Sequence, residues 1–129
     1  MITKFTEHRA RHHIPIYDFK FWVVVTSDME KSRAGFNRIL GRDAGDCEVG
    51  HCVGLTSRGE GRVLAMFLDA DYLDHGLIAH EVFHATHSIM EFLESVYADA
   101  TQEPYSALCE YLTKLVYKDL RKWGLGRRL

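Results

Sequence analysis

The sequence predicts a single α+β domain in which a small mixed sheet of about three strands packs against helices. Its 129 residues suit one domain, and 47% hydrophobic with 26% charged residues are typical of a folded globular chain. Runs of β-branched and aromatic residues dominate the first half, and two long stretches with helical periodicity follow them. We therefore expect one unit over residues 1–129, with a sheet that leads into two helices.

The N-terminal third is expected to contain an arm, a strand and a helix. Residues 1–18 show no clear period and carry a cluster of histidines and arginines, which predicts a loosely attached arm. Phe19–Thr26 is rich in valine and aromatic residues and predicts a central strand. Ser27 and Asp28 supply an N-cap for an amphipathic helix, which we expect to end at Gly41.

The middle of the chain is expected to form a hairpin. Alternating apolar residues predict a strand over Glu48–Ser57, and a turn with two glycines follows at 58–61. Arg62–Ala70 supplies the partner strand. Asp71 is then placed to cap a helix that begins near Tyr72.

Two helices are expected to complete the domain. The first, over Tyr72–Tyr97, has one apolar side and one side rich in histidine and glutamate. The second has Thr101 as a candidate cap and Pro104 in its first turn, and it reaches Trp123. The hairpin would therefore lead directly into the histidine-bearing helix.

Charge and hydropathy exclude two classes of partner. The 16 basic and 18 acidic residues leave a formal net charge of −2, so no global positive field would attract nucleic acid or an anionic membrane. No apolar run reaches the roughly 18 residues of a membrane span, and the first residues lack the apolar region of a secretory signal. We therefore expect a cytoplasmic protein that binds neither nucleic acid nor membrane. The sequence predicts no oligomeric state.

The cysteines are expected to be thiols. Cys47, Cys52 and Cys109 are odd in number and lack the spacing of a disulfide framework, which suits a reducing compartment. Cys47, His51 and Cys52 are candidates for a second metal site. A strand through them would place the adjacent His51 and Cys52 on opposite faces, which disfavours that site.

The first long helix carries the most informative pattern. His80, Glu81 and His84 form an HExxH sequence, and residues four apart on a helix lie one turn apart on one face. Two imidazoles so placed can converge on one zinc ion, and the intervening glutamate can act as general base on a metal-bound water. His87 and Glu91 continue the same polar side.

A catalytic zinc usually has three protein ligands, so the two histidines need a third. His87, Glu91 and Glu94 lie too far along the same straight helix to close a tetrahedron easily. We expect His87 either to support the site, paired with Glu91, or to be plain surface. Glu103 follows His84 by nineteen residues, on a helix that could fold back against the first. Glu110 is two turns further on the same side, and one zinc can take only one of these two glutamates.

The HExxH sequence, followed by Gln102, Glu103 and Ser106 in the first, second and fifth places of an Asn-Glu-x-x-Ser-Asp pattern, resembles the gluzincin metallopeptidases. The resemblance covers about residues 61–115 and is strongest to the compact metallopeptidase-like proteins of bacteriophages. It implies a zincin-like fold, Zn²⁺ with Glu103 as third ligand, and a peptide or protein substrate. It also implies the cytoplasm of a bacterial or phage-infected cell.

The chain departs from this family at Ala107, where the family has an aspartate that supports a ligand histidine. That support would then have to come from another acid. The candidates for it are Asp74, Glu91 and Glu110. The candidates for stabilising an oxyanion are Tyr105, Tyr111 and His87.

The expected reaction is peptide hydrolysis. Zinc would lower the pKa of its water toward about 7, and Glu81 would take the proton and later pass it to the leaving amine. An extended substrate would pair with the strand around Val63–Leu68, taken as the edge of the sheet.

Three alternatives stay open. The first is a catalytically weak or inactive zinc-binding module that acts through protein interaction. The second resembles the peptide deformylases, in which an upstream cysteine completes HExxH, and it would use Cys52 in the segment Gly50–Leu55. In the third, the histidines form only a polar helix face.

Overall fold

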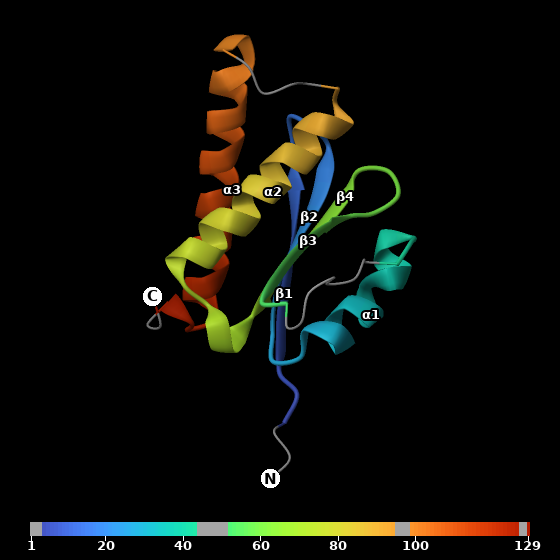
Figure 1. The fold of residues 1–129 in the computed structure, drawn as a ribbon, viewed down its shortest axis with the longest axis vertical. Coiled ribbons are helices and arrows are strands. Elements are labelled where there is room, and N and C mark those ends of the chain that lie inside the picture. Colours follow the sequence, from blue (N-terminus) through green and yellow to red (C-terminus); the bar gives the residue numbers. More distant parts are fainter. Residues whose placement is uncertain (1–3, 44–51, 95–98, 127–128) are drawn as a thin grey trace.

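The computed structural model describes residues 4–43, 52–94, 99–126 and 129, and it has an α+β architecture. A four-stranded mixed sheet is covered on one face by helix α1 (Met29–Leu40) and on the other by helices α2 (His75–Phe92) and α3 (Gln102–Lys122) (Figure 1). The predicted α+β class and mixed sheet are confirmed, with four strands in place of about three.

The strands lie in the order β1-β2-β4-β3. β1 (Glu7–Ile14) and β2 (Phe19–Thr26) are antiparallel, β2 and β4 (Val63–Asp69) are parallel, and β4 and β3 (Gly54–Arg58) are antiparallel. β4 is buried throughout and β2 nearly so, because each has covered faces and a strand on either side. The predicted central position of Phe19–Thr26 is therefore confirmed.

The predicted N-terminal arm is wrong, because residues 7–14 form the edge strand β1. Alternate residues of this strand face the two helical layers. His8 stacks on Trp123 beyond α3, whereas the guanidinium of Arg9 lies over the ring of Phe36 in α1. Polar residues on both faces of an edge strand hide the period of two that normally indicates a strand.

Helix α1 (Met29–Leu40) has the predicted caps. The Asp28 carboxylate accepts a hydrogen bond from the backbone N–H of Lys31, and Gly41 has the left-handed φ of 73° that a C-terminal glycine provides. Its apolar face covers β2 and β4 through a cluster around Phe36 and Leu40. The helix also provides the crossover that parallel strands β2 and β4 require.

Helices α2 (His75–Phe92) and α3 (Gln102–Lys122) pack on the opposite face of the sheet (Figure 1). The predicted apolar side of α2 is buried together with the apolar stripe of α3 and the sheet residues below them. The fully or almost fully buried residues of these two helices include Ile78, Val82, Ala85, Ile89, Leu108, Leu112, Val116 and Leu120.

Several predicted boundaries shift. Asp74 caps α2 in place of Asp71, because its carboxylate accepts the backbone N–H of Leu77, while residues 70–72 form a 3₁₀ turn. α2 ends at Phe92, and the predicted continuation over 95–98 lies outside the described residues. Thr101 precedes α3 without a side-chain capping bond.

The predicted strand Glu48–Ser57 corresponds to β3 only at its C-terminal end. Residues 44–51, and with them Cys47 and His51, lie outside the described part of the chain. Cys109 is a free thiol as expected, but Cys52 is disulfide-bonded, which corrects the prediction of three thiols. Among the described residues, no helix combines the length and apolar character needed to cross a membrane.

Candidate metal centre

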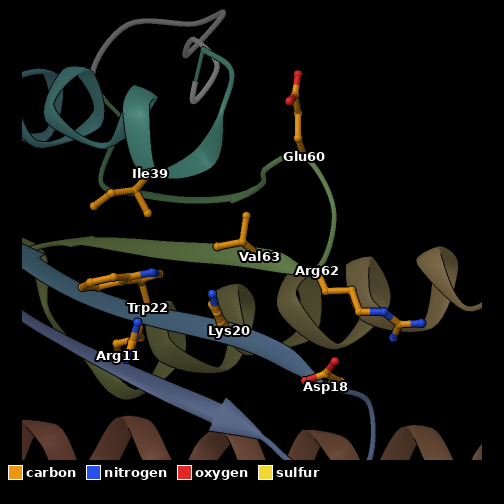
Figure 2. A pocket seen from close by; sticks show the side chains of 8 residues that line it. All are labelled: Arg11, Asp18, Lys20, Trp22, Ile39, Glu60, Arg62 and Val63. Carbon is orange, nitrogen blue, oxygen red and sulfur yellow. The ribbon is translucent and has the colours of Figure 1, made fainter.

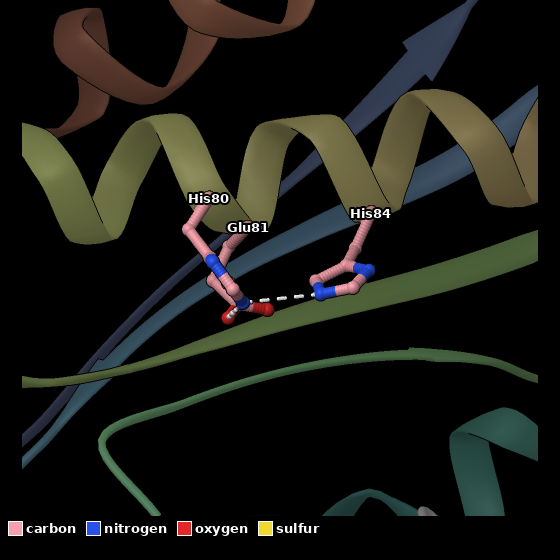
Figure 3. A group of neighbouring side chains, drawn as sticks. All are labelled: His80, Glu81 and His84. Carbon is pink, nitrogen blue, oxygen red and sulfur yellow. Dashed lines mark hydrogen bonds and ion pairs between the residues drawn. The ribbon is translucent and has the colours of Figure 1, made fainter.

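The HExxH turn of α2 brings three potential metal ligands together. One ligand atom each from His80, Glu81 and His84 lies within 4.8 Å of the others (Figure 3). Among the described residues, these three form the one group of three or more potential metal ligands. The Nε2 atoms of His80 and His84 are 3.1 Å apart, and their rings stand edge to face with centroids separated by 4.7 Å. The helix therefore points two imidazole nitrogens at one place.

Burial separates the three side chains into two roles. His80 and His84 are exposed, whereas Glu81 is 3% exposed. Residue 81 lies about 100° round the helix from residue 80, between the apolar side that faces the core and the polar side that carries the imidazoles. Its carboxylate consequently enters the space between α2 and β3.

A strand residue holds that carboxylate. The hydroxyl of Thr56 in β3 donates to Glu81 Oε1 over 2.8 Å, and Glu81 Oε2 lies 3.8 Å from His80 Nε2. A buried carboxylate is costly without such donors. One oxygen of Glu81 is thus engaged by the strand, and the other faces the imidazoles.

The close approach of β3 to Glu81 depends on a glycine. A Cβ at Gly54 would lie 2.7 Å from Leu77 Cδ1 and 2.9 Å from Glu81 Oε2, closer than real Cβ contacts come. Gly54 and Thr56 are the residues of the candidate site that the sequence does not predict. The isolated glycine in an alternating strand was the available signal, since it marks a close backbone or side-chain approach.

The imidazole pair fits one zinc ion. Tetrahedral zinc with Zn–N distances of about 2.0–2.1 Å separates two ligand nitrogens by roughly 3.3 Å. The observed 3.1 Å between the Nε2 atoms is close to that value, and neither ring would have to leave its helix position. Two histidines fill two of the four coordination positions.

The predicted third ligand is not brought to the histidines. Glu103 and Glu110 are exposed on α3, and neither belongs to the group around His80 and His84. α3 folds back on the apolar side of α2, because its own apolar stripe has to be buried there. His80 and His84 project from another side of α2, away from α3 (Figure 3).

The supporting residues expected on α2 also lie apart from the imidazole pair. His87 Nε2 is 3.4 Å from a carboxylate oxygen of Glu91, and both side chains are more than half exposed. Glu94 has φ 59° beyond the end of the helix. Asp74 caps the helix by accepting the backbone N–H of Leu77.

The remaining candidates have other surroundings. Tyr105 is 4% exposed and packs in the core, whereas Tyr111 lines an apolar pocket beside the β1–β2 turn. Cys52, the ligand in the deformylase-like alternative, is disulfide-bonded and is not part of the His80–Glu81–His84 group.

The expected substrate edge is also corrected. β4, with Val63–Leu68, lies between β2 and β3, so its backbone groups are already paired. β1 and β3 are the end strands of the described sheet, and β3 is the one that contacts Glu81.

Fold and site together define an α+β protein with a His–Glu–His group between a helix and the end of its sheet. No family model, curated protein or solved structure matches the chain.

Proposed function

We propose that this protein is a zinc-dependent metallopeptidase in which His80 and His84 hold the ion and Glu81 is the general base. The observation that carries the proposal is the pair of Nε2 atoms 3.1 Å apart beside a buried carboxylate. A zincin-like arrangement, with the HExxH helix packed on a mixed sheet and followed by a C-terminal helix, is part of the same proposal.

The proposal assigns two protein ligands. The two imidazoles are neutral nitrogen donors of the kind that zinc prefers, and the carboxylate one residue away would lie beside the metal without binding it. Glu103 is not part of this assignment, because α3 packs on the other side of α2. When bound, zinc would polarise a substrate carbonyl and lower the pKa of a water molecule.

The residues of the chain perform the proton transfers. Glu81 accepts a proton from the attacking water through the oxygen that faces His80, and it later donates that proton to the leaving amine. Thr56 engages the other oxygen and fixes the direction of the carboxylate. Fixing the carboxylate in advance removes reorientation from the reaction.

An extended peptide would reach this site along β3. This strand ends the described sheet and lies next to Glu81 through Thr56. An added strand pairs its backbone with such an edge, and alternate side chains then face the site. We therefore place the substrate backbone on β3.

Hydrolysis by Glu81→Gln tests the proposal. The substitution keeps the shape of the side chain and removes its basicity, so we expect at least a hundredfold loss of turnover on an unfolded-protein or quenched-peptide substrate. Glu91→Gln on the exposed side of the same helix is the matched control and should retain activity. Full activity in Glu81→Gln, with zinc still bound, would rule out the general-base role.

A catalytically inactive zinc-binding module is the second candidate. The observation that favours it is that only two potential histidine ligands and Glu81 come together within the described chain. The two candidates differ in one measurement: a peptidase loses hydrolysis with a chelator and regains it with zinc, whereas the module binds zinc without hydrolysis at any stage.

A further inference from the structure

A cavity lies on the opposite side of the sheet from the histidines. It has a volume of about 590 Å³, within the range of small-molecule sites, and it opens between the sheet and the C-terminal end of α1 (Figure 2). Trp22 in its wall packs against Phe36 of α1, which places the cavity on the α1 face. The proposed peptidase site uses none of its residues.

Two cations on neighbouring strands line this cavity. Arg11 is the cross-strand partner of Trp22, and Lys20 is paired in register with Val63. Neither the Arg11 guanidinium nor the Lys20 amine forms an ion pair or hydrogen bond with another residue in the described ranges. In Figure 2 the Lys20 amine points into the space beside Val63 and Trp22. Cations of this kind bind phosphate or carboxylate groups.

A third cation lies at the rim, next to an acid. Arg62 donates to the backbone carbonyl of Tyr17 over 2.6 Å, and its guanidinium lies over the ring of Phe92 in α2, with Asp18 beside it in Figure 2. The hydrogen bond with His13 holds the pKa of Asp18 below its ordinary value, and the positive charges of Arg62 and Lys20 act in the same direction. Lys20 is thus close enough to this end of the cavity to act on an anion, while Asp18 contributes a negative charge at the rim.

An aromatic wall lies next to the cations. The Trp22 indole stands edge to face against Phe36, with centroids 5.3 Å apart and planes at 84°, so its orientation is fixed by the core. Ile39 and Val63 line the cavity beside it. Nucleobases stack on aromatic side chains of this kind in proteins that bind single-stranded nucleic acid.

We propose that this cavity binds a nucleoside monophosphate or a closely similar aromatic phosphate monoester. Arg11 and Lys20 contact the phosphate, and Trp22 packs on the ring. Arg11 and Lys20, the two lining cations without an ion-pair partner in the described ranges, together supply two positive charges. That charge matches one phosphate monoester, which carries about −1.5 to −2 at pH 7, whereas a nucleic-acid strand would bring several phosphates close to Asp18 and Glu60.

Titration calorimetry with adenosine 5′-monophosphate tests the proposal on the full chain, with adenosine and inorganic phosphate as separate ligands. We expect the monophosphate to bind at least tenfold more tightly than either, because only it uses both the cations and the ring. Lys20→Gln should weaken binding about tenfold, the usual effect of losing one charge-assisted hydrogen bond. Lys114→Gln removes the same charge from exposed α3 on the other side of the sheet, and it should leave binding unchanged.

Each contrary result overturns a stated part of the proposal. The site fails if the monophosphate does not bind at millimolar concentration, or if Lys20→Gln and Lys114→Gln bind it equally. The role of Trp22 fails if inorganic phosphate binds as tightly as the monophosphate. Binding of a single-stranded oligonucleotide without binding of the monophosphate would replace the small-molecule site with a nucleic-acid surface.

Discussion

The hydroxyl of Thr56 donates a hydrogen bond to the carboxylate of Glu81 across 2.8 Å, and so ties the end strand β3 to the HExxH helix. The two residues are 25 positions apart in the chain. This contact fixes a buried acid beside two exposed imidazoles, and it gives the strand a direct role in the geometry of the site.

Thr56→Val should destabilise the protein and impair the site. Valine has the shape of threonine but no hydroxyl, so Glu81 Oε1 loses its donor while buried. We expect a loss of about 1–2 kcal/mol in the free energy of unfolding, measured by urea denaturation. Thr56→Ser restores the donor and should recover most of that loss. Equal stability of the valine and serine variants would show that the hydrogen bond contributes little.

Gly54→Ala should displace Glu81. The new methyl group would lie 2.7 Å from Leu77 Cδ1 and 2.9 Å from Glu81 Oε2, and both side chains would have to shift. Overpacking of this kind costs about 1–3 kcal/mol, and we expect the melting temperature to fall.

The matched control for that substitution is Gly35→Ala. A Cβ at Gly35, within α1, meets nothing within 4 Å, so alanine should stabilise this helix by about 0.5–1 kcal/mol. The two alanine variants should therefore melt on opposite sides of the wild type. A Gly54→Ala protein as stable as Gly35→Ala would refute the close approach.

Asp119→Asn should destabilise the contact between β1 and α3. Asp119 has 5% of its side chain exposed, and its Oδ2 lies 2.6 Å from His12 Nε2. Removing the charge from this nearly buried pair should cost about 2 kcal/mol in the free energy of unfolding. Asp18→Asn is the control. Its partner His13 lies on β1, as His12 does, but the Asp18 side chain is 78% exposed.

The control should change stability far less, because solvent screens an exposed pair. Asparagine also tolerates the left-handed φ of 53° at position 18. Denaturation curves for both variants at pH 6 check the comparison, and equal losses would argue against a structural role for the buried pair.

Much of the fold could be predicted from local patterns. The valine-rich run Phe19–Thr26, Asp28 as N-cap and Gly41 as C-terminal glycine lie where the sequence indicates. β1 was missed for a physical reason: Arg9 contacts α1 and His12 contacts α3, so both faces of this edge strand are polar and no apolar alternation appears.

The candidate site was predictable as far as one helix determines it. His80 and His84 converge because they are one turn apart, a relation that spacing alone provides. Glu103 was placed by sequence distance, but the side on which α3 packs depends on burial of its apolar stripe. Thr56 lies in a strand whose hairpin partner was predictable, but its contact with Glu81 depends on where α2 packs against the sheet.

Zinc content measured by elemental analysis tests the central claim most directly. After dialysis against a small excess of zinc and then buffer, wild-type protein should retain about one zinc per chain, and His84→Ala should retain almost none. His87→Ala, on the same helix and outside the imidazole pair, should keep the wild-type amount. A wild-type protein without near-stoichiometric zinc, or a His84→Ala variant that keeps it, would contradict the assignment of this centre.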